Sequence, residues 1–245
     1  MALLKSSNPA FGDKIWKNVD FAYTTPMTLQ GTINKTLISL LLVVASALYV
    51  WDMYMQGGNI TGIMMGGFIG GFVVAMVTIF KNDWAKYTVP LYAVLEGAAL
   101  GGISAMFEIK YPGMPMQAVA LTFGTFLVML FAYKAGVIRA TEKFRSVMIA
   151  AMGGIMVVYL ISFVMSMFGT TPFTYGNSLM SIGFSLVVVV IAALSLILDF
   201  DFIEKGVQQQ LPKKYEWMGA FGLLVTLVWL YMEMLRLLSK ISSRN

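Results

Sequence analysis

The sequence predicts an all-α integral membrane protein built as a bundle of seven transmembrane helices. The first observation is composition: of 245 residues, 58% are hydrophobic and only 12% are charged, whereas a soluble domain carries about 25% charged residues. The second is a mean hydropathy of +0.77. The third is the length of the apolar runs, because crossing a hydrocarbon core about 30 Å thick takes roughly 20 helical residues.

Seven apolar stretches of 18 to 22 residues meet this length requirement. Turn-forming and polar segments separate them, such as Gln56 to Asn59 and Tyr111 to Gly113. No separating segment is long enough for a soluble domain, so we expect a polar N-terminal segment over 1–31, one transmembrane domain over 32–240 and a short tail over 241–245. The predicted spans, in order, are Asn34–Trp51, Ile60–Phe80, Thr88–Phe107, Pro115–Tyr133, Val147–Phe168, Leu179–Asp199 and Met218–Leu238.

Connections rich in basic residues alternate along the chain with connections that are poor in them, so seven spans gather most basic residues on one side of the membrane. The positive-inside rule places the richer side in the cytoplasm, together with the N-terminus. The poorer side has Lys110 in its loops and Arg236, Lys240 and Arg244 in the tail. Because a basic tail prefers the cytoplasm, a re-entrant seventh stretch with six full spans is the alternative. The richer side carries Lys5, Lys14, Lys17, Lys35, Lys81, Lys86, Lys134, Arg139, Lys143, Arg145, Lys205, Lys213 and Lys214.

Cysteine and histidine are both absent from the chain. Their absence excludes disulfides, Cys/His zinc or haem sites and any nucleophile activated by histidine, so we expect neither an enzyme nor a resident cofactor. The net charge of +5 fits basic cytoplasmic loops better than a nucleic-acid partner, and lipid is the expected partner. We expect no removable signal peptide, because the first 31 residues are polar.

Glycine pairs spaced four apart occur in two of the predicted spans. Gly66, Gly67, Gly70 and Gly71 form two such pairs, and Gly97 with Gly101 forms a third. Small residues at this spacing allow helix backbones to approach closely, which predicts tight packing between helices.

Two carboxyl groups fall inside predicted spans and are candidate functional residues, because a charge in the bilayer is costly unless it is sheltered. Glu96 lies about 12 Å into its span, and the stretch Thr88–Phe107 contains no Lys or Arg. We therefore expect it to meet a partner on another helix, a cation, water or a proton. Glu233 has the alternative of pairing with Arg236 or Lys240 in its own helix.

Asp199 ends a small, weakly polar helix face in the sixth stretch. Ser181, Ser185, Ala192 and Ser195 lie on that face at helical spacing, so it should point into the bundle. Asp201 lies about 200° further round the helix and groups instead with Glu204, one turn on. The alternative for these acidic residues is a solvated position at the cytoplasmic interface.

Several segments, in their order and spacing from Met27 to Ser239, resemble the Bax-inhibitor-1-like transmembrane family, and its bacterial branch most closely. The resemblance implies a seven-helix bundle with a central helix, a bacterial cytoplasmic membrane location and a pH-sensitive Ca²⁺ leak. The segments are MTLQGTINKT, LYAVLEGAALGGISAMFE, YPGMPMQAVALTF, YKAGVIRATEKFRS, LDFDFIEKG and WMGAFGLLVTLVWLYMEMLRLLS.

The resemblance also implies a gate made of two aspartates, one on the sixth and one on the seventh helix. The first falls on Asp199 or Asp201, and the second falls near Thr226. Threonine cannot ionise, so we expect Asp199 to act with Asp201 or Glu96 instead. The basic residue that the family places in the second helix is also missing between Ile60 and Phe80.

These observations predict a passive, pH-modulated cation leak with Ca²⁺ as the expected permeant ion, since hard cations take oxygen ligands. Protonation of intramembrane carboxyl groups would gate it, with Asp199, Asp201, Glu96, Glu233 and the position of Thr226 along the path. The alternative is a non-transporting membrane regulator that binds and restrains a membrane protease or another membrane protein. A proton-coupled transporter is disfavoured because no internal repeat is evident.

Overall fold

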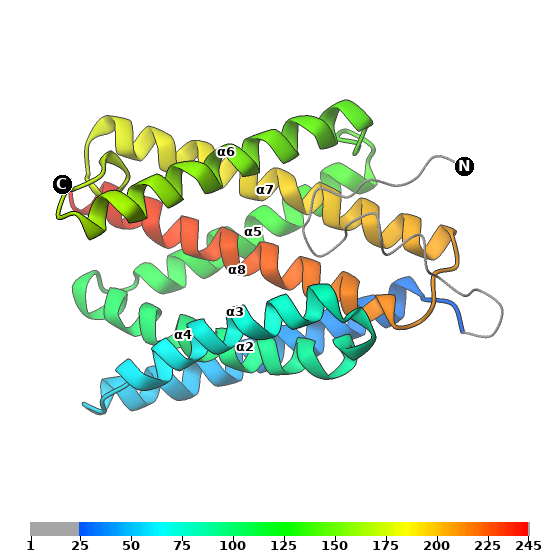
Figure 1. Ribbon diagram of the computed structural model, residues 1–245, viewed down its shortest axis with the longest axis horizontal. Coiled ribbons are helices and arrows are strands. Elements are labelled where there is room, and N and C mark those ends of the chain that lie inside the picture. The colour runs from blue at the N-terminus through cyan, green and yellow to red at the C-terminus, as the bar shows by residue number, and fades with distance from the viewer. Residues whose placement is uncertain (1–24, 245) are drawn as a thin grey trace. The chain divides into compact units, whose positions relative to one another are not determined.

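The structure is a computed structural model that describes residues 25–244 (Figure 1). Its seven long helices are each long and apolar enough to span a membrane, which confirms the predicted fold class. Most of the expected polar segment, 1–24, lies outside the described residues. The helices are α2 (Leu29–Met55), α3 (Thr61–Phe80), α4 (Ala85–Lys110), α5 (Met114–Lys134), α6 (Glu142–Met167), α7 (Leu179–Gln208) and α8 (Tyr215–Ser242), with short 3-10 turns η2 (Asn82–Trp84) and η3 (Phe173–Tyr175).

Except for α3, which begins one residue later than predicted, the helices extend beyond the predicted spans at one or both ends, mostly into polar sequence. α7 continues nine residues past Asp199 to Gln208, because a charged residue ends a hydropathic run without ending a helix. The seventh stretch forms one continuous helix of 28 residues, which is long enough for a full span.

Burial differs sharply among the helices. In the most apolar 18-residue segment of α8, 83% of the segment is buried inside the protein. The corresponding share is 56% in α4 and α7, and 22% or less in α2, α3, α5 and α6. A helix that is apolar all round and buried is a core helix. α8 therefore has the burial that the resemblance predicts for the central helix.

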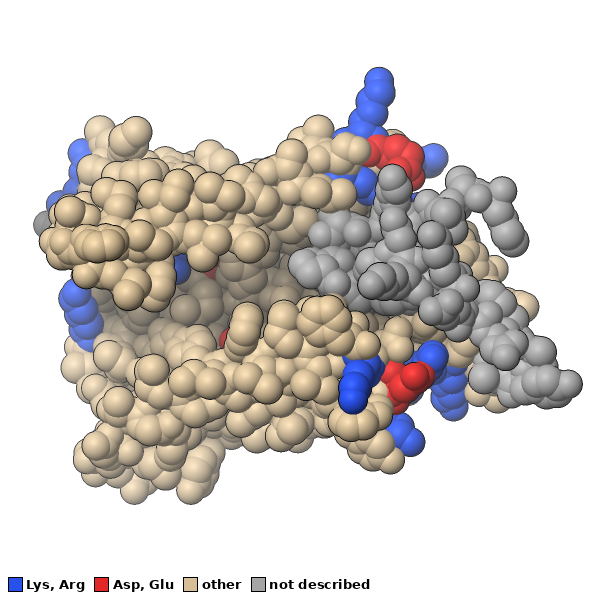
Figure 2. All heavy atoms as spheres, viewed as in Figure 1, with Lys and Arg blue, Asp and Glu red and all other residues tan. Residues whose placement is uncertain are grey.

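Many large apolar side chains on the helices are exposed, as expected for contact with lipid. Leu41, Phe72 and Val128 are each at least 65% exposed. Figure 2 shows charged side chains gathered near helix ends, with uncharged surface between them. This distribution places the helix ends in the polar regions of a bilayer.

Local sequence determines several helix ends. The Thr28 side chain caps α2 by accepting a hydrogen bond from the backbone N–H of Gly31, and Thr141 caps α6 in the same way. Before α5, Gly113 adopts a φ of +80°, which glycine tolerates best. Pro115 then occupies the first turn of α5, where its missing N–H costs nothing.

The described chain divides into two compact units, and α7 and α8 contribute to both. The first unit comprises 25–112 and Asp199–Val225, and the second comprises Gly113–Leu198 and 226–244.

In the first unit, glycines allow α4 to approach both α2 and α3 closely. A side chain at Gly101 would collide with the backbone carbonyl oxygen of Ala47 in α2, and one at Gly67 would come within 2.6 Å of the Leu95 carbonyl oxygen in α4. The prediction of tight packing is confirmed for these glycines. Gly66 faces open space, so the two pairs in α3 are not equivalent.

The residues before α2 are also held within the first unit. The N–H of Met27 donates to the carbonyl oxygen of Leu211 at 2.7 Å, and the N–H of Lys213 donates to that of Thr25 at 2.9 Å. These bonds attach the start of α2 to the connection between α7 and α8.

The second unit contains α5, α6, most of α7 and the C-terminal part of α8. η3 packs beside α6, and the Thr174 hydroxyl donates to Ser162 Oγ at 2.9 Å. Phe184 of α7 makes edge-to-face contacts with Tyr159 and Phe173. Aromatic rings and hydroxyl groups therefore join the ends of α6 and α7.

Candidate functional site

The small face of α7 points inward, as the spacing predicts. Ser181, Ser185 and Ala192 are fully buried and Ser195 is 6% exposed. Asp199, at the end of this face, is only 2% exposed. The interior position of Asp199 is therefore confirmed, and the solvated alternative is wrong for this residue.

Asp201 lies in a different environment from the one that the sequence indicates. It is 8% exposed, and its carboxylate forms an ion pair with Lys205 at 2.9 Å. Glu204 is exposed and accepts a hydrogen bond from Gln208. Both aspartates at this end of α7 are therefore buried, whereas Glu204 is not.

Glu96 of α4 is half-buried and lies against α3 in the first unit. A side chain at Gly71 would come within 2.8 Å of Glu96 Oε2, so the glycine provides the space for the carboxylate. Glu96 forms no hydrogen bond or ion pair with any residue that the structure describes. The expected partner on another helix is therefore not found in the described chain, and a cation, water or a proton remains.

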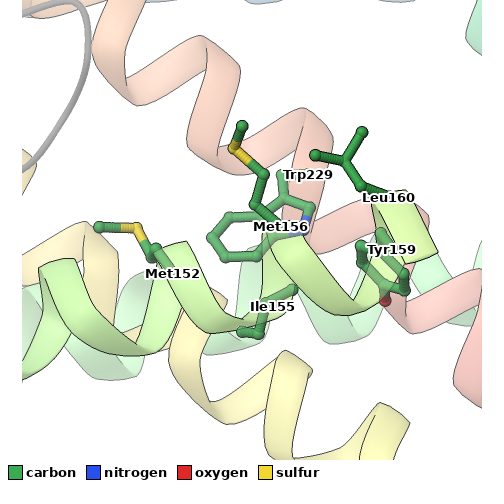
Figure 3. Close-up of a pocket in the computed structure, with 6 residues that line it drawn as sticks. All are labelled: Met152, Ile155, Met156, Tyr159, Leu160 and Trp229. Carbon is green, nitrogen blue, oxygen red and sulfur yellow. The ribbon is translucent and has the colours of Figure 1, made fainter. Parts of the chain in front are cut away.

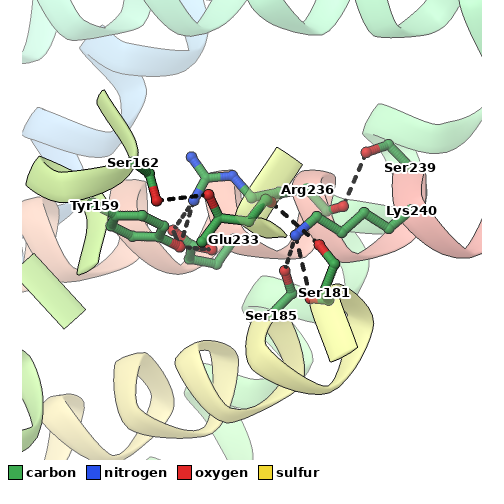
Figure 4. A network of polar contacts seen from close by, with 9 residues as sticks. Tyr159, Ser162, Ser181, Ser185, Glu233, Arg236, Ser239 and Lys240 are labelled. Carbon is green, nitrogen blue, oxygen red and sulfur yellow. Dashed lines mark hydrogen bonds and ion pairs between the residues drawn. The ribbon is translucent and has the colours of Figure 1, made fainter. Parts of the chain in front are cut away.

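Glu233 of α8 is 2% exposed and has its partners in the second unit. The Tyr159 hydroxyl lies 3.0 Å from both carboxylate oxygens, and Arg236 Nη1 donates to Oε1 at 2.9 Å (Figure 4). Of the two predicted pairings, the one with Arg236 is confirmed. Lys240 instead donates to Ser185 Oγ at 2.7 Å and to the Ser181 carbonyl oxygen at 3.3 Å.

These contacts form part of a larger polar network in the second unit. Ser181 donates to the carbonyl oxygen of Thr174 at 3.3 Å, and Thr174 donates to Ser162. The network therefore ties α6, η3, α7 and α8 together with buried hydrogen bonds. Thr226, the position that the resemblance indicates on α8, is buried at 5% exposure.

Sequence reasoning missed a buried ion pair in the first unit. Glu216, in the first turn of α8, is fully buried and accepts bonds from Lys35 and from the backbone N–H and hydroxyl of Thr28, the latter two at 2.9 and 3.0 Å. Gly31 provides the space for its carboxylate. The available signal was an acidic residue in the first turn of a helix, but nothing local points to Lys35.

No three acidic side chains in the described residues lie close enough to hold a metal ion. The carboxyl groups of Glu96 and Asp199 belong to the first unit, and Glu233 belongs to the second. Within the described residues, carboxyl groups therefore occur inside spans without forming a cluster of three metal ligands.

Seven spanning helices with carboxyl groups buried along them define a polytopic membrane protein with ionisable residues in its interior. The family described as Bax inhibitor 1 like matches residues 8–243. The chain belongs to that family, which confirms the resemblance, while its placement in the bacterial branch stays a prediction. No match was found among curated proteins.

Proposed function

We propose that this protein is a passive, pH-modulated cation leak of the membrane, with Ca²⁺ as the permeant ion. The observation that carries the proposal is Glu96, a half-buried carboxyl group inside a span that has no hydrogen bond or ion pair with any described residue. Asp199, buried in the same unit, is the second carboxyl group of the proposed path. Asp201 already has Lys205 as its counter-ion.

The physical argument rests on the cost of a carboxyl group in the membrane. Such a group is expensive unless a cation, water or a proton accompanies it. Carboxylate oxygens suit Ca²⁺, and conduction requires sites weak enough for the ion to leave. Separate carboxyl groups meet that requirement better than a cage of several ligands would.

The sign of the pH dependence follows from competition between protons and cations. A protonated carboxyl group carries no charge and no longer attracts a cation. Cation flux is therefore expected to fall as the pH is lowered. An Asp199→Asn or Glu96→Gln variant mimics the protonated form and should stay at the low-flux level at every pH.

The test is Ca²⁺ entry into proteoliposomes across a pH series, with the wild type, Asp199→Asn and Glu96→Gln. Asp52→Asn is the matched control, because Asp52 is an exposed carboxylate on α2. We expect the control to follow the wild type and both other variants to lose the pH-dependent flux. Flux equal to that of protein-free vesicles would overturn the leak and leave the non-transporting membrane regulator as the function.

We further propose a cytoplasmic N-terminus in a bacterial inner membrane. Among the described helix connections, 81–84, 135–141 and 209–214 each contain Lys or Arg and have more at their flanks. The connections 56–60, 111–113 and 168–178 contain none, and only Lys110 lies at a flank. The positive-inside rule assigns the basic connections to the cytoplasm.

A further inference from the structure

A shallow apolar groove of about 340 Å³ lies between α6 and α8 in the second unit (Figure 3). Met156 and Leu160, on one of its walls, are 63% and 52% exposed. Such a groove on a helix that faces lipid has the surface chemistry of an acyl-chain contact. Its lining residues are Met152, Ile155, Met156, Tyr159, Leu160 and Trp229.

Tyr159, which lines the groove, also contacts the cationic side chain of Arg236. The guanidinium of Arg236 lies 4.8 Å from the ring centroid of Tyr159. Arg236 uses only Nη1 for its bonds to Tyr159 and Glu233. Its side chain is 36% exposed, and Nε and Nη2 make no hydrogen bond within the described chain. These two donors remain available to a ligand.

The charges around this end of the groove do not cancel. Glu233 contributes −1, Arg236 +1 and Lys240 +1, which leaves +1 over the three groups. Lys240 is 6% exposed and bonds only to the neutral oxygens of Ser181 and Ser185. Charge complementarity therefore favours an anionic occupant.

We propose that the groove binds one acyl chain of an anionic phospholipid whose phosphate contacts Arg236. Arg236 lies seven positions after Trp229 along α8, about 10 Å of helix. A lipid held at Arg236 can therefore reach Trp229 with the first part of its chain. A planar guanidinium with two free donors suits a phosphate. The proposal is independent of ion conduction.

The test measures quenching of Trp229 fluorescence by lipids with brominated acyl chains. The protein is reconstituted with a small fraction of brominated phosphatidylglycerol or, separately, brominated phosphatidylcholine. Subtracting the signal of Trp229→Phe isolates the response of Trp229 from that of the other four tryptophans. We expect the anionic lipid to be preferred about fivefold, the selectivity that one cation near a membrane surface supplies.

Three variants decide whether Arg236 is the contact. Arg236→Gln should lower the ratio of quenching by the anionic lipid to quenching by phosphatidylcholine toward one. Arg244→Gln, which removes the same charge from the exposed tail, should leave this ratio unchanged. Glu233→Gln combined with Arg236→Gln avoids an unpaired buried carboxylate and keeps the net charge of the three groups. Loss of preference in this double variant supports a direct contact. Equal quenching by both lipids in the wild type, no quenching of Trp229, or a preference retained in the double variant would each overturn the proposal.

Discussion

Two glutamates of the first unit, the half-buried Glu96 and the fully buried Glu216, have very different surroundings. Glu216 has three donors from Lys35 and Thr28, whereas Glu96 has none from the described residues. A buried charge with its full set of partners is structural. A carboxyl group without partners inside a span is the better candidate for exchange with protons or cations.

Removing Lys35 tests the structural role of the first glutamate. Lys35→Met leaves Glu216 buried without its counter-ion, so we expect a loss of about 3–5 kcal/mol in the free energy of unfolding. Lys35→Met combined with Glu216→Gln should lose clearly less. Denaturant unfolding in detergent, followed by tryptophan fluorescence, measures both values.

The control for Lys35 is a second lysine in an ion pair of the same unit. Lys214 pairs with Asp83, whose side chain is 72% exposed, and exposed pairs contribute at most about 1 kcal/mol. Lys214→Met should therefore be nearly neutral. A loss as large as that of Lys35→Met would contradict the assignment of the stabilisation to burial.

The sequence allowed some of these residue partners to be predicted and not others. Glu233 and Arg236 are three residues apart on one helix, so their pairing followed from helical geometry. Lys35 and Glu216 are 181 residues apart, and only the packing of α8 against the start of α2 brings them together. The inward face of α7 was predictable from its small residues. The ion pair between Asp201 and Lys205 joins residues four apart on α7, so the same helical geometry would have found it once the helix was known to continue past Asp199.

At the scale of elements, helix number and type were predictable because hydropathy over about 20 residues is a strong signal. Helix ends were not, since polar residues such as Asp201 and Glu204 continue α7 beyond its apolar run. The glycine spacing in α3 and α4 indicated close packing, but it did not show which glycines face a neighbour. Gly101 faces α2 and Gly66 faces open space.

This difference between glycines gives a prediction for helix packing. Gly101→Ala places a methyl group against the Ala47 backbone, which cannot move aside without shifting α2. We expect a loss of about 1–3 kcal/mol in the free energy of unfolding, the usual cost of overpacking. Detergent-solubilised protein unfolded by heat or denaturant provides the measurement.

Gly66→Ala and Gly153→Ala are the matched controls, because nothing lies within 4 Å of either added methyl group. Alanine has the higher helix propensity, by up to about 1 kcal/mol. Both variants should be neutral or slightly stabilised. Equal destabilisation at all three positions would show that the loss comes from the backbone and not from contact with α2.

For the whole molecule, the open question is which side of the membrane the end of α8 reaches. The basic tail favours the cytoplasm, whereas seven spans place it outside. Contacts within one unit tie the end of α8 to the α6–α7 connection. Asn177, in the connection after α6, donates to the Ser243 carbonyl oxygen at 3.2 Å, and Lys240 bonds to Ser181 and Ser185 at the start of α7. The end of α8 must therefore lie on the same side as the α6–α7 connection.

Single cysteines test this topology directly, because the chain has none of its own. Val137 and Phe168, which are 77% and 82% exposed, flank the two ends of α6. With a membrane-impermeant maleimide on intact cells, we expect Phe168→Cys and Ser243→Cys to react, and Val137→Cys to react only after permeabilisation. If Val137→Cys reacted on intact cells and the other two variants reacted only after permeabilisation, the protein would have the opposite orientation. If Ser243→Cys followed Val137→Cys instead, the end of α8 would lie on the other side of the membrane from the α6–α7 connection, contrary to the Asn177 and Lys240 contacts.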